Sequence, residues 1–222
     1  MWEPPPSFGD MLGDAELAAP WAGDYTPLAV PEVGTVLARR PRPDAIPHLA
    51  LSVNPATDPQ AQQHHATLFV RNHIAPDDHE RILAAMMDET MPDNTIGLLA
   101  RALATWGTER PYVAVMTLAY AAADHWRALR TRLRGDGHPN PMTTLTSMHD
   151  ILDEAEKLWL ESLQTGNEDR DQHEQTKLFD KLYGPEPGTT QTVSKGTVRP
   201  AGFEPGDVAT DFKAAARALG AR

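Results

Sequence analysis

Apolar side chains are most concentrated between Pro111 and Leu133, where from Tyr112 to Ala123 only Thr117 interrupts the apolar run. Residues of this stretch recur at the three-and-four spacing of one helix face. These are Tyr112, Val115, Met116, Ala119, Ala123, Trp126, Leu129 and Leu133. The pattern predicts one long helix, with its first half enclosed by other helices and its second half amphipathic. The apolar run ends after about a dozen residues, short of the roughly 20 that a membrane span needs.

Further helical patterns flank this stretch on both sides. They cover residues 44–53, 58–73, a segment from 77 onward, 94–107, 147–163 and 170–183. Asp77 with Glu80, and Ser147 with Asp150, have the spacing of capping boxes. Thr108 is a candidate cap for the central helix. No period of 20 to 50 residues repeats, which excludes a solenoid. The predicted fold class is all-α, a compact multi-helix domain around one central buried helix.

The two ends of the chain differ in composition from the predicted domain, which covers residues 38–184. Residues 1–37 are acidic and rich in proline, and we expect a disordered arm there. Its apolar residues leave open a second interpretation, in which part of the arm lies along the folded body or a partner. They are Phe8, Met11, Leu12, Leu17, Trp21 and Tyr25. Residues 185–206 have the composition of a flexible linker.

Residues 207–220 have the pattern of a short amphipathic helix at the end of that linker. A helix of this length is marginal alone in water, so its apolar face needs a covering surface on its own domain or on a partner. We therefore predict partner-binding residues at Phe203, Val208, Phe212 and Leu219, with Phe212 and Leu219 as anchors.

Composition excludes several classes of partner and compartment. The net charge is −11 and the isoelectric point is about 5.2, which disfavours binding to nucleic acid. There is no cysteine, so neither disulfides nor thiolate metal sites can form. The first residues lack the basic start and apolar run of a secretory signal, and we expect a cytoplasmic protein without membrane contact. The arginines at 127, 130, 132 and 134 contact phosphate, neutralise the acidic helices at 150–180 or interact favourably with the C-terminus of their own helix.

The sequence offers weak candidates for chemistry. The histidines at 64, 65, 73 and 79 lie near acidic residues, but their spacing matches no HExxH pattern. Asp124 and His125 diverge on a helix and cannot both serve one substrate together with Asp153 or Glu154. Glycine-rich phosphate loops and GxSxG motifs do not occur. We expect no enzymatic activity, no cofactor and no metal; a metal-dependent hydrolase that uses residues 64–80 is the least favoured class.

Several stretches resemble a known family. The segment ATWGTERPYVAVMTLAYAAADHWRALRTRL, residues 104–133, is similar to the tail-assembly chaperones of long-tailed phages that infect actinobacteria. Further similar stretches are RPRPDAI from Arg40, LFVRNHI from Leu68, TLTSMHDILDEAE from Thr144 and KLFDKLYGP from Lys177. The similarity covers roughly residues 37–185 and consists of packing and capping patterns.

The resemblance implies a helical, non-catalytic protein that acts in the host bacterial cytoplasm and is absent from the mature virion. Its implied partner is the tape-measure protein, whose long hydrophobic helices such chaperones keep soluble. The major tail protein, which forms the tail tube, is a further implied partner, and self-association is another option. The family also has short and frameshifted forms. The alternative function is a structural head-to-tail connector that is retained in the virion.

Overall fold

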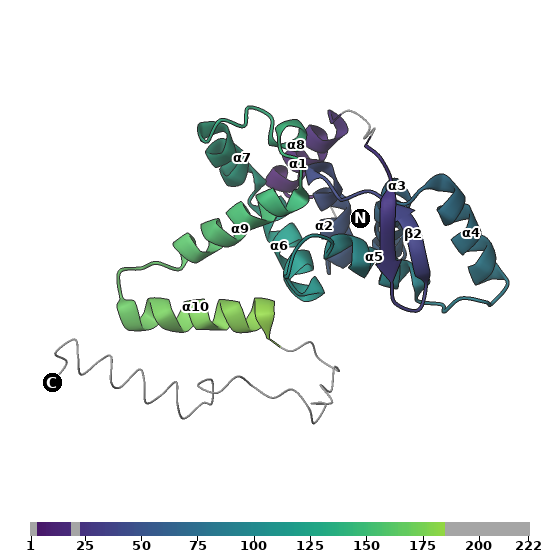
Figure 1. The fold of residues 1–222 in the computed structure, drawn as a ribbon. Coiled ribbons are helices and arrows are strands. Elements are labelled where there is room, and N and C mark those ends of the chain that lie inside the picture. Colours follow the sequence, from purple (N-terminus) through teal and green to yellow (C-terminus); the bar gives the residue numbers. More distant parts are fainter. Residues whose placement is uncertain (1–3, 19–22, 185–222) are drawn as a thin grey trace, which may run out of the picture. The chain divides into compact units, whose positions relative to one another are not determined.

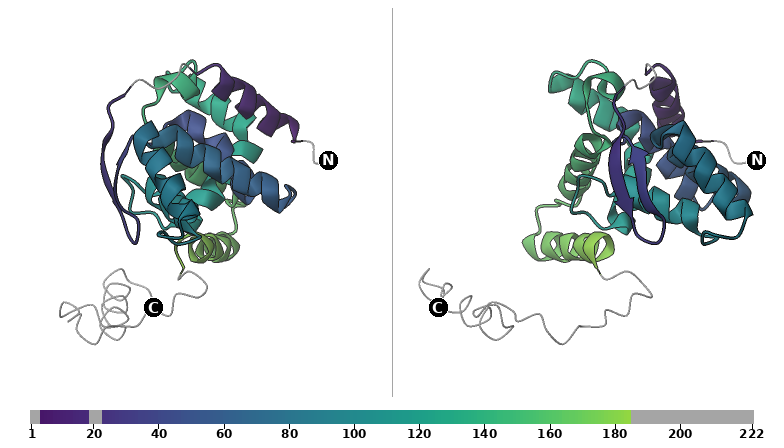
Figure 2. Two further views of the ribbon diagram at one scale, coloured as in Figure 1. Left: turned by 90° about the vertical axis from the view of Figure 1, so that its right-hand side faces the viewer. Right: turned by 45° about the vertical axis from the view of Figure 1, so that its right-hand side comes forward.

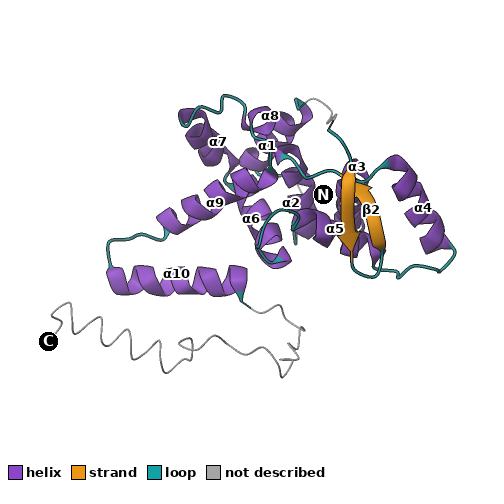
Figure 3. Ribbon diagram, viewed as in Figure 1, coloured by secondary structure: helices purple, strands orange, loops and turns teal. Residues whose placement is uncertain are grey.

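The computed structural model describes residues 4–18 and 23–184, which form a helical body with one short β-hairpin (Figures 1 and 3). In chain order the elements are α1 (Pro6–Glu16), β1 (Thr26–Val30), β2 (Gly34–Ala38), the 3-10 turn η1 (Pro43–Ala45), α2 (Ile46–Val53), α3 (Pro59–His73), α4 (Pro76–Met87), α5 (Thr95–Ala104), α6 (Tyr112–Asp124), α7 (Trp126–Gly135), α8 (Pro141–Thr144), α9 (Met148–Ser162) and α10 (Glu168–Tyr183). The all-α prediction is confirmed, with the hairpin as an addition.

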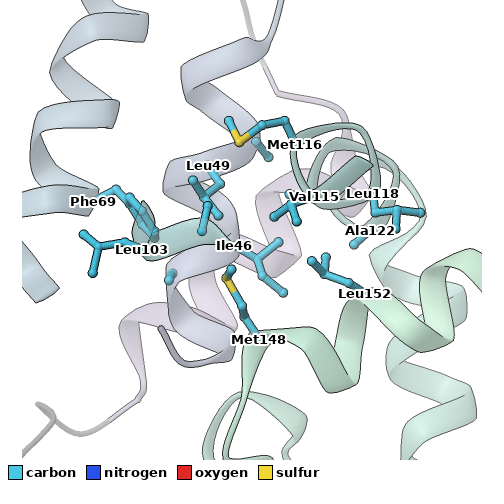
Figure 4. Packing of buried hydrophobic residues seen from close by; sticks show 14 of the residues in the cluster. Ile46, Leu49, Phe69, Leu103, Val115, Met116, Leu118, Ala122, Met148 and Leu152 are labelled. Carbon is cyan, nitrogen blue, oxygen red and sulfur yellow. The ribbon is translucent and has the colours of Figure 1, made fainter. Parts of the chain in front are cut away.

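Helix α6 is the centre of the body. It contacts α1, α2, α5, α7, α9 and α10, and its buried face is built largely from small residues that allow close approach. Figure 4 shows Val115 and Ala122 of α6 beside Ile46 of α2 and Leu152 of α9. All four side chains are fully buried. The predicted central buried helix is therefore confirmed for the segment Tyr112–Asp124.

The prediction of one continuous helix from 111 to 133 is wrong. Helix α6 ends at Asp124, and α7 begins at Trp126 after a turn at His125. The Trp126 ring is fully buried, and its Nε1 donates a hydrogen bond to Asp14 Oδ2 of α1 at 2.7 Å. The helix axis changes direction where this tertiary contact holds the ring against α1. The second half is amphipathic as predicted, with Leu129 and Leu133 buried.

The prediction of a disordered arm over residues 1–37 is wrong for most of its length. Residues 6–16 form α1, and residues 26–38 form the hairpin, which Figure 2 shows lying against the helices. The alternative interpretation holds for Phe8 and Met11, whose side chains are buried in the common core. Leu17 is 75% exposed, and Trp21 lies outside the described residues. The burial of Phe8 and Met11, spaced three residues apart on α1, stabilises this segment although its overall composition, acidic and rich in proline, disfavours folding.

The hairpin is antiparallel and joins the body through the end of β2. Leu28 pairs with Val36, and β2 begins directly after the turn at Gly34, whose φ of +97° is a conformation that glycine adopts without strain. Beyond the sheet, Ala75 N donates to Leu37 O at 2.8 Å, and Asp78 Oδ2 accepts from Leu37 N at 2.7 Å. These bonds hold β2 beside the junction of α3 and α4.

The predicted helix caps were partly right. Ser147 and Asp150 form a capping box at the start of α9, as the spacing indicated. The box predicted at Asp77 and Glu80 is absent. With Asp77 as N-cap the helix would begin at Asp78, but α4 begins two residues earlier, at Pro76, without a side-chain cap. Thr108 does not cap α6 either; its hydroxyl accepts from Arg110 N at 3.2 Å.

Two further points concern the ends and membranes. The predicted linker, 185–206, and the terminal helix, 207–220, lie outside the described residues.

Among the residues that are described, no helix has the length and apolarity to span a bilayer.

Candidate partner-binding surface

An apolar groove runs along the outer side of α6. It consists of two hollows, of about 570 and 290 Å³, that share Ala121, His125 and Trp159. Apart from these shared residues, the larger hollow is lined by Val53, Pro55, Tyr112, Val113, Met116, Thr117, Tyr120, Asp124 and Lys181, and the smaller by Ala128, Leu129, Ala155, Leu158 and Ser162. We refer to both hollows together as the α6 groove. Its size lies within the roughly 300–1,000 Å³ typical of ligand pockets.

The groove exists because α6 is apolar around most of its circumference. A helix of this kind is normally covered on all sides. Here α2 and α9 cover one side, while Val113 remains 37% exposed and Tyr120 36% exposed. Val53, at the end of α2, is 39% exposed and extends the same surface. Large exposed apolar residues in one hollow are typical of an interaction site.

The wall of the groove that α9 and α10 form is fixed by one arginine. Arg110 pairs with Asp153 at 2.5 Å and Glu156 at 2.5 Å, and its Nε donates to the Tyr183 hydroxyl at 3.4 Å. The Tyr183 hydroxyl in turn donates to Glu156 at 2.7 Å. Burial opposes the charge of Arg110, but its hydrogen bonds to Glu156 and Asp153 outweigh burial and raise the pKa of the guanidinium. The Arg110 guanidinium stays protonated and connects α9, through Asp153 and Glu156, with α10, through Tyr183.

Lys181 and Trp159 form the polar edge of the groove. The Lys181 ammonium lies 5.1 Å from the centre of the Trp159 ring, a cation-π arrangement that holds the ring at the rim. On the other rim, Asp124 and His125 are exposed and 3.8 Å apart. The groove is therefore apolar at its base, with a few charged groups at its edges.

The arginines of α7 have structural partners on two elements. Arg132 pairs with Glu154 at 3.0 Å and Glu161 at 2.6 Å, as the predicted neutralisation of the acidic helices requires. Arg127 and Arg130 instead pair with α1, at 2.7 Å from Asp10 and 2.8 Å from Asp14 respectively. Arg134 donates to Pro139 O at 3.0 Å. The predicted neutralisation of the acidic helices is correct for Arg132. For Arg127 and Arg130 the acidic partners lie on α1, which the sequence did not indicate.

Histidines of the segment 64–79 have structural contacts. His73 Nδ1 lies 2.6 Å from Phe69 O within α3, and burial lowers the pKa of the ring to about 4. The His48 and His65 rings are 5.9 Å apart. Within residues 4–18 and 23–184, no three His, Asp or Glu side chains are placed to share a metal ion. Glu154 and Asp153, weighed above as partners of Asp124, are engaged by arginines.

The predicted contact residues Phe203, Val208, Phe212 and Leu219 lie outside the described residues. Sequence reasoning missed the α6 groove, because it took the unbroken apolar run of α6 as a sign of complete enclosure. The signal was present in the sequence, since a helix that is apolar all round needs more covering surface than its neighbours in the chain supply.

Comparison with known proteins decides the family. The model of a phage tail assembly chaperone protein family matches residues 1–111, half of the chain. This chain belongs to the phage tail assembly chaperone family. Residues 121–221 of the chaperone match a second family, which is described as of unknown function. No curated protein and no solved structure matches. The resemblance to tail-assembly chaperones is confirmed, and the chain has a role in tail assembly.

The two family matches meet within one folded unit. The gap between them falls inside α6, and the unit Met1–Gly184 contains the first match and the second match as far as Gly184. The ion pairs of α1 with α7, and of Arg110 with α9, connect the two matched regions. Up to Gly184, the region of unknown function is thus the second half of the chaperone body.

Proposed function

We propose that this chaperone binds the tape-measure protein of its phage through the α6 groove and keeps the long apolar helices of that protein soluble during tail assembly. The family supports a role in tail assembly, and the groove is the observation that carries the finer proposal. Its lining is mainly apolar, and its charged groups, Asp124, His125 and Lys181, lie at the edges.

An amphipathic helix is the client element that best matches the groove. A helix binds in a groove through side chains about one turn apart, which enter separate hollows along one line. The two hollows of the α6 groove share residues and so form one continuous surface. Aromatic residues at its base, Tyr112 and Tyr120, provide large contact area at low entropic cost.

The charge around the groove indicates which helices it selects. Between Asp150 and Lys181 there are ten acidic and four basic residues, so α9 and α10 are strongly negative. A client helix with lysine or arginine beside its apolar face would gain attraction and speed of association from this field. Acidic client helices would be disfavoured by the same charges.

We further propose that the chaperone helps bring tail-tube subunits to the bound tape-measure protein in the host cytoplasm. The apolar pattern of residues 207–220 supports a second contact with the client, the tube subunit or another copy of the chaperone. In this proposal Phe203, Val208, Phe212 and Leu219 supply that contact.

The groove is tested by Val113→Glu, which places a carboxylate in the larger hollow. We expect co-expressed tape-measure protein in the soluble fraction to fall by about tenfold, because the charge loses hydration on binding. Leu83→Glu is the matched control: Leu83 is 39% exposed on α4 and lines neither hollow, so this variant should act like the natural chain. If the amount of soluble tape-measure protein fell equally in both variants, or fell in neither, the groove would be excluded as the client site.

Mass spectrometry of purified virions separates the chaperone from the connector alternative. We expect the chain to be absent from mature particles and present in lysates of infected cells. Stoichiometric recovery from virions would support the connector and overturn the assembly-only role.

A further inference from the structure

A separate hollow, of about 560 Å³, lies where the end of the hairpin meets the C-terminal end of α3. The backbone bond from Arg39 N to His73 O, 2.9 Å long, holds residues 39–42 beside the last turn of α3. The lining thereby gathers arginines from two distant segments. They are Arg39, Arg40, Arg42 and Arg71. We refer to this hollow as the arginine pocket.

The arginine pocket is positively charged within an acidic protein. Its charged lining consists of the four arginines and two carboxylates, Glu16 and Asp44, which leaves a formal charge of +2. The whole chain carries −11. Burial raises the pKa of Asp44, while the charges of Arg42 and Arg39 act in the opposite direction. A local excess of positive charge is thus preserved where the rest of the chain is negative.

Two of the arginines are available to an anionic ligand. The Arg40 guanidinium lies 5.7 Å from the centre of the Trp106 ring, and an aromatic ring holds a cation without cancelling its charge. Arg71 is exposed in the last turn of α3, where the helix dipole favours a cation. In the part of the chain that the structure describes, neither of them has a carboxylate partner.

Apolar groups complete the lining. Leu12 is half-buried in the same hollow, above the buried Pro47 and Ile74, so a ligand meets both charge and the apolar surface of Leu12. A guanidinium binds a carboxylate with two parallel hydrogen bonds, which suits an acidic side chain next to an apolar one.

We propose that the arginine pocket binds an acidic peptide segment of a partner protein, with carboxylates on Arg40 and Arg71 and an apolar side chain against Leu12. This site is distinct from the α6 groove, with which it shares no lining residue. A chaperone with both sites holds an apolar helix and an acidic segment at the same time.

The test titrates the isotope-labelled full chain with the capped peptide Glu-Glu-Leu-Glu-Glu as the probe. Binding is monitored through the NMR signals of the arginine side chains. We expect saturable shifts that weaken as salt is added. Arg40→Gln and Arg71→Gln should each weaken binding about threefold, and the double variant about tenfold. Arg170→Gln, which removes the same charge from an exposed position on α10, should leave binding unchanged.

Three outcomes would overturn the proposal. The first is equal binding of the peptide Gln-Gln-Leu-Gln-Gln, and the second is unchanged affinity in Arg71→Gln, a variant on an exposed helical position that leaves the core intact. The third is tighter binding of inorganic phosphate or of a short DNA duplex than of the acidic peptide. No tape-measure protein is present in this experiment, so its result is independent of the function proposed for the α6 groove.

Discussion

His73 illustrates how position alone changes the chemistry of a residue. In the sequence it is one of several histidines in a segment that invites a metal site. In the structure its ring is buried against Phe69 at the end of α3, where its Nδ1 and the Phe69 carbonyl oxygen are 2.6 Å apart. The ring is therefore kept neutral, and its role is to complete the packing between α3 and β2.

The neutral state of His73 predicts a loss of stability in acid. Burial lowers the pKa of the folded ring from 6.5 to about 4, so between these values the unfolded chain binds a proton that the folded chain does not. The free energy of unfolding should therefore fall as the pH decreases from 6.5 to about 4, by about 3 kcal/mol from this group, and then level off. Urea unfolding across this pH range measures the effect.

The control for this prediction is a histidine on the surface. His73→Leu should remove most of this pH dependence, whereas His173→Gln, at an exposed position of α10, should retain it. An unchanged slope in His73→Leu would show that another group is responsible.

Single elements show when a local signal is enough. The capping box of α9 is local, because Ser147 and Asp150 bond the backbone of their own turn. The first turn of α4 instead takes part in a tertiary contact, because Asp78 accepts a bond from Leu37 N of β2 at 2.7 Å. Two similar sequence patterns thus gave one correct and one wrong prediction.

The difference between these two helix starts can be measured. Ser147→Ala should lower the free energy of unfolding by about 1 kcal/mol, because it leaves a donor of the first turn without its partner. Glu80→Ala, which would be equally costly in a true capping box, should change stability by less than about 0.5 kcal/mol. Equal losses in the two variants would mean that α4 is capped in solution as the sequence first indicated.

At the scale of the whole molecule, the body depends on contacts between the two family matches. Helix α1 belongs to the first match and α7 to the second, and they meet at Trp126 and Asp14. Asp14 also pairs with Arg130, so one carboxylate satisfies a buried indole N–H and a guanidinium. The acidic N-terminal segment is therefore part of the body and not an independent arm.

Asp14→Ala tests this coupling. It should lower the free energy of unfolding by about 1–3 kcal/mol, because the indole N–H of Trp126 is left buried without an acceptor. Hydrogen exchange should rise in α7, which lies more than a hundred residues away in the chain. Glu16→Ala, on the same helix but exposed, is the control and should have little effect. Unaltered exchange in α7 would contradict the packing of α1 on it.

The sequence by itself determined the helical class, the central position of Tyr112–Asp124, the limits of α3, α9 and α10 to within a few residues, and the family. These features depend on periodicity, caps and composition, which act over one or two turns. Only the tertiary structure decided the break at His125, the order of the N-terminal segment, the α6 groove and the arginine pocket. Each of these depends on residues far apart in the chain, such as Asp14 bonded to Trp126 or Arg40 and Arg71 lining one hollow, and no local pattern records which of them come together.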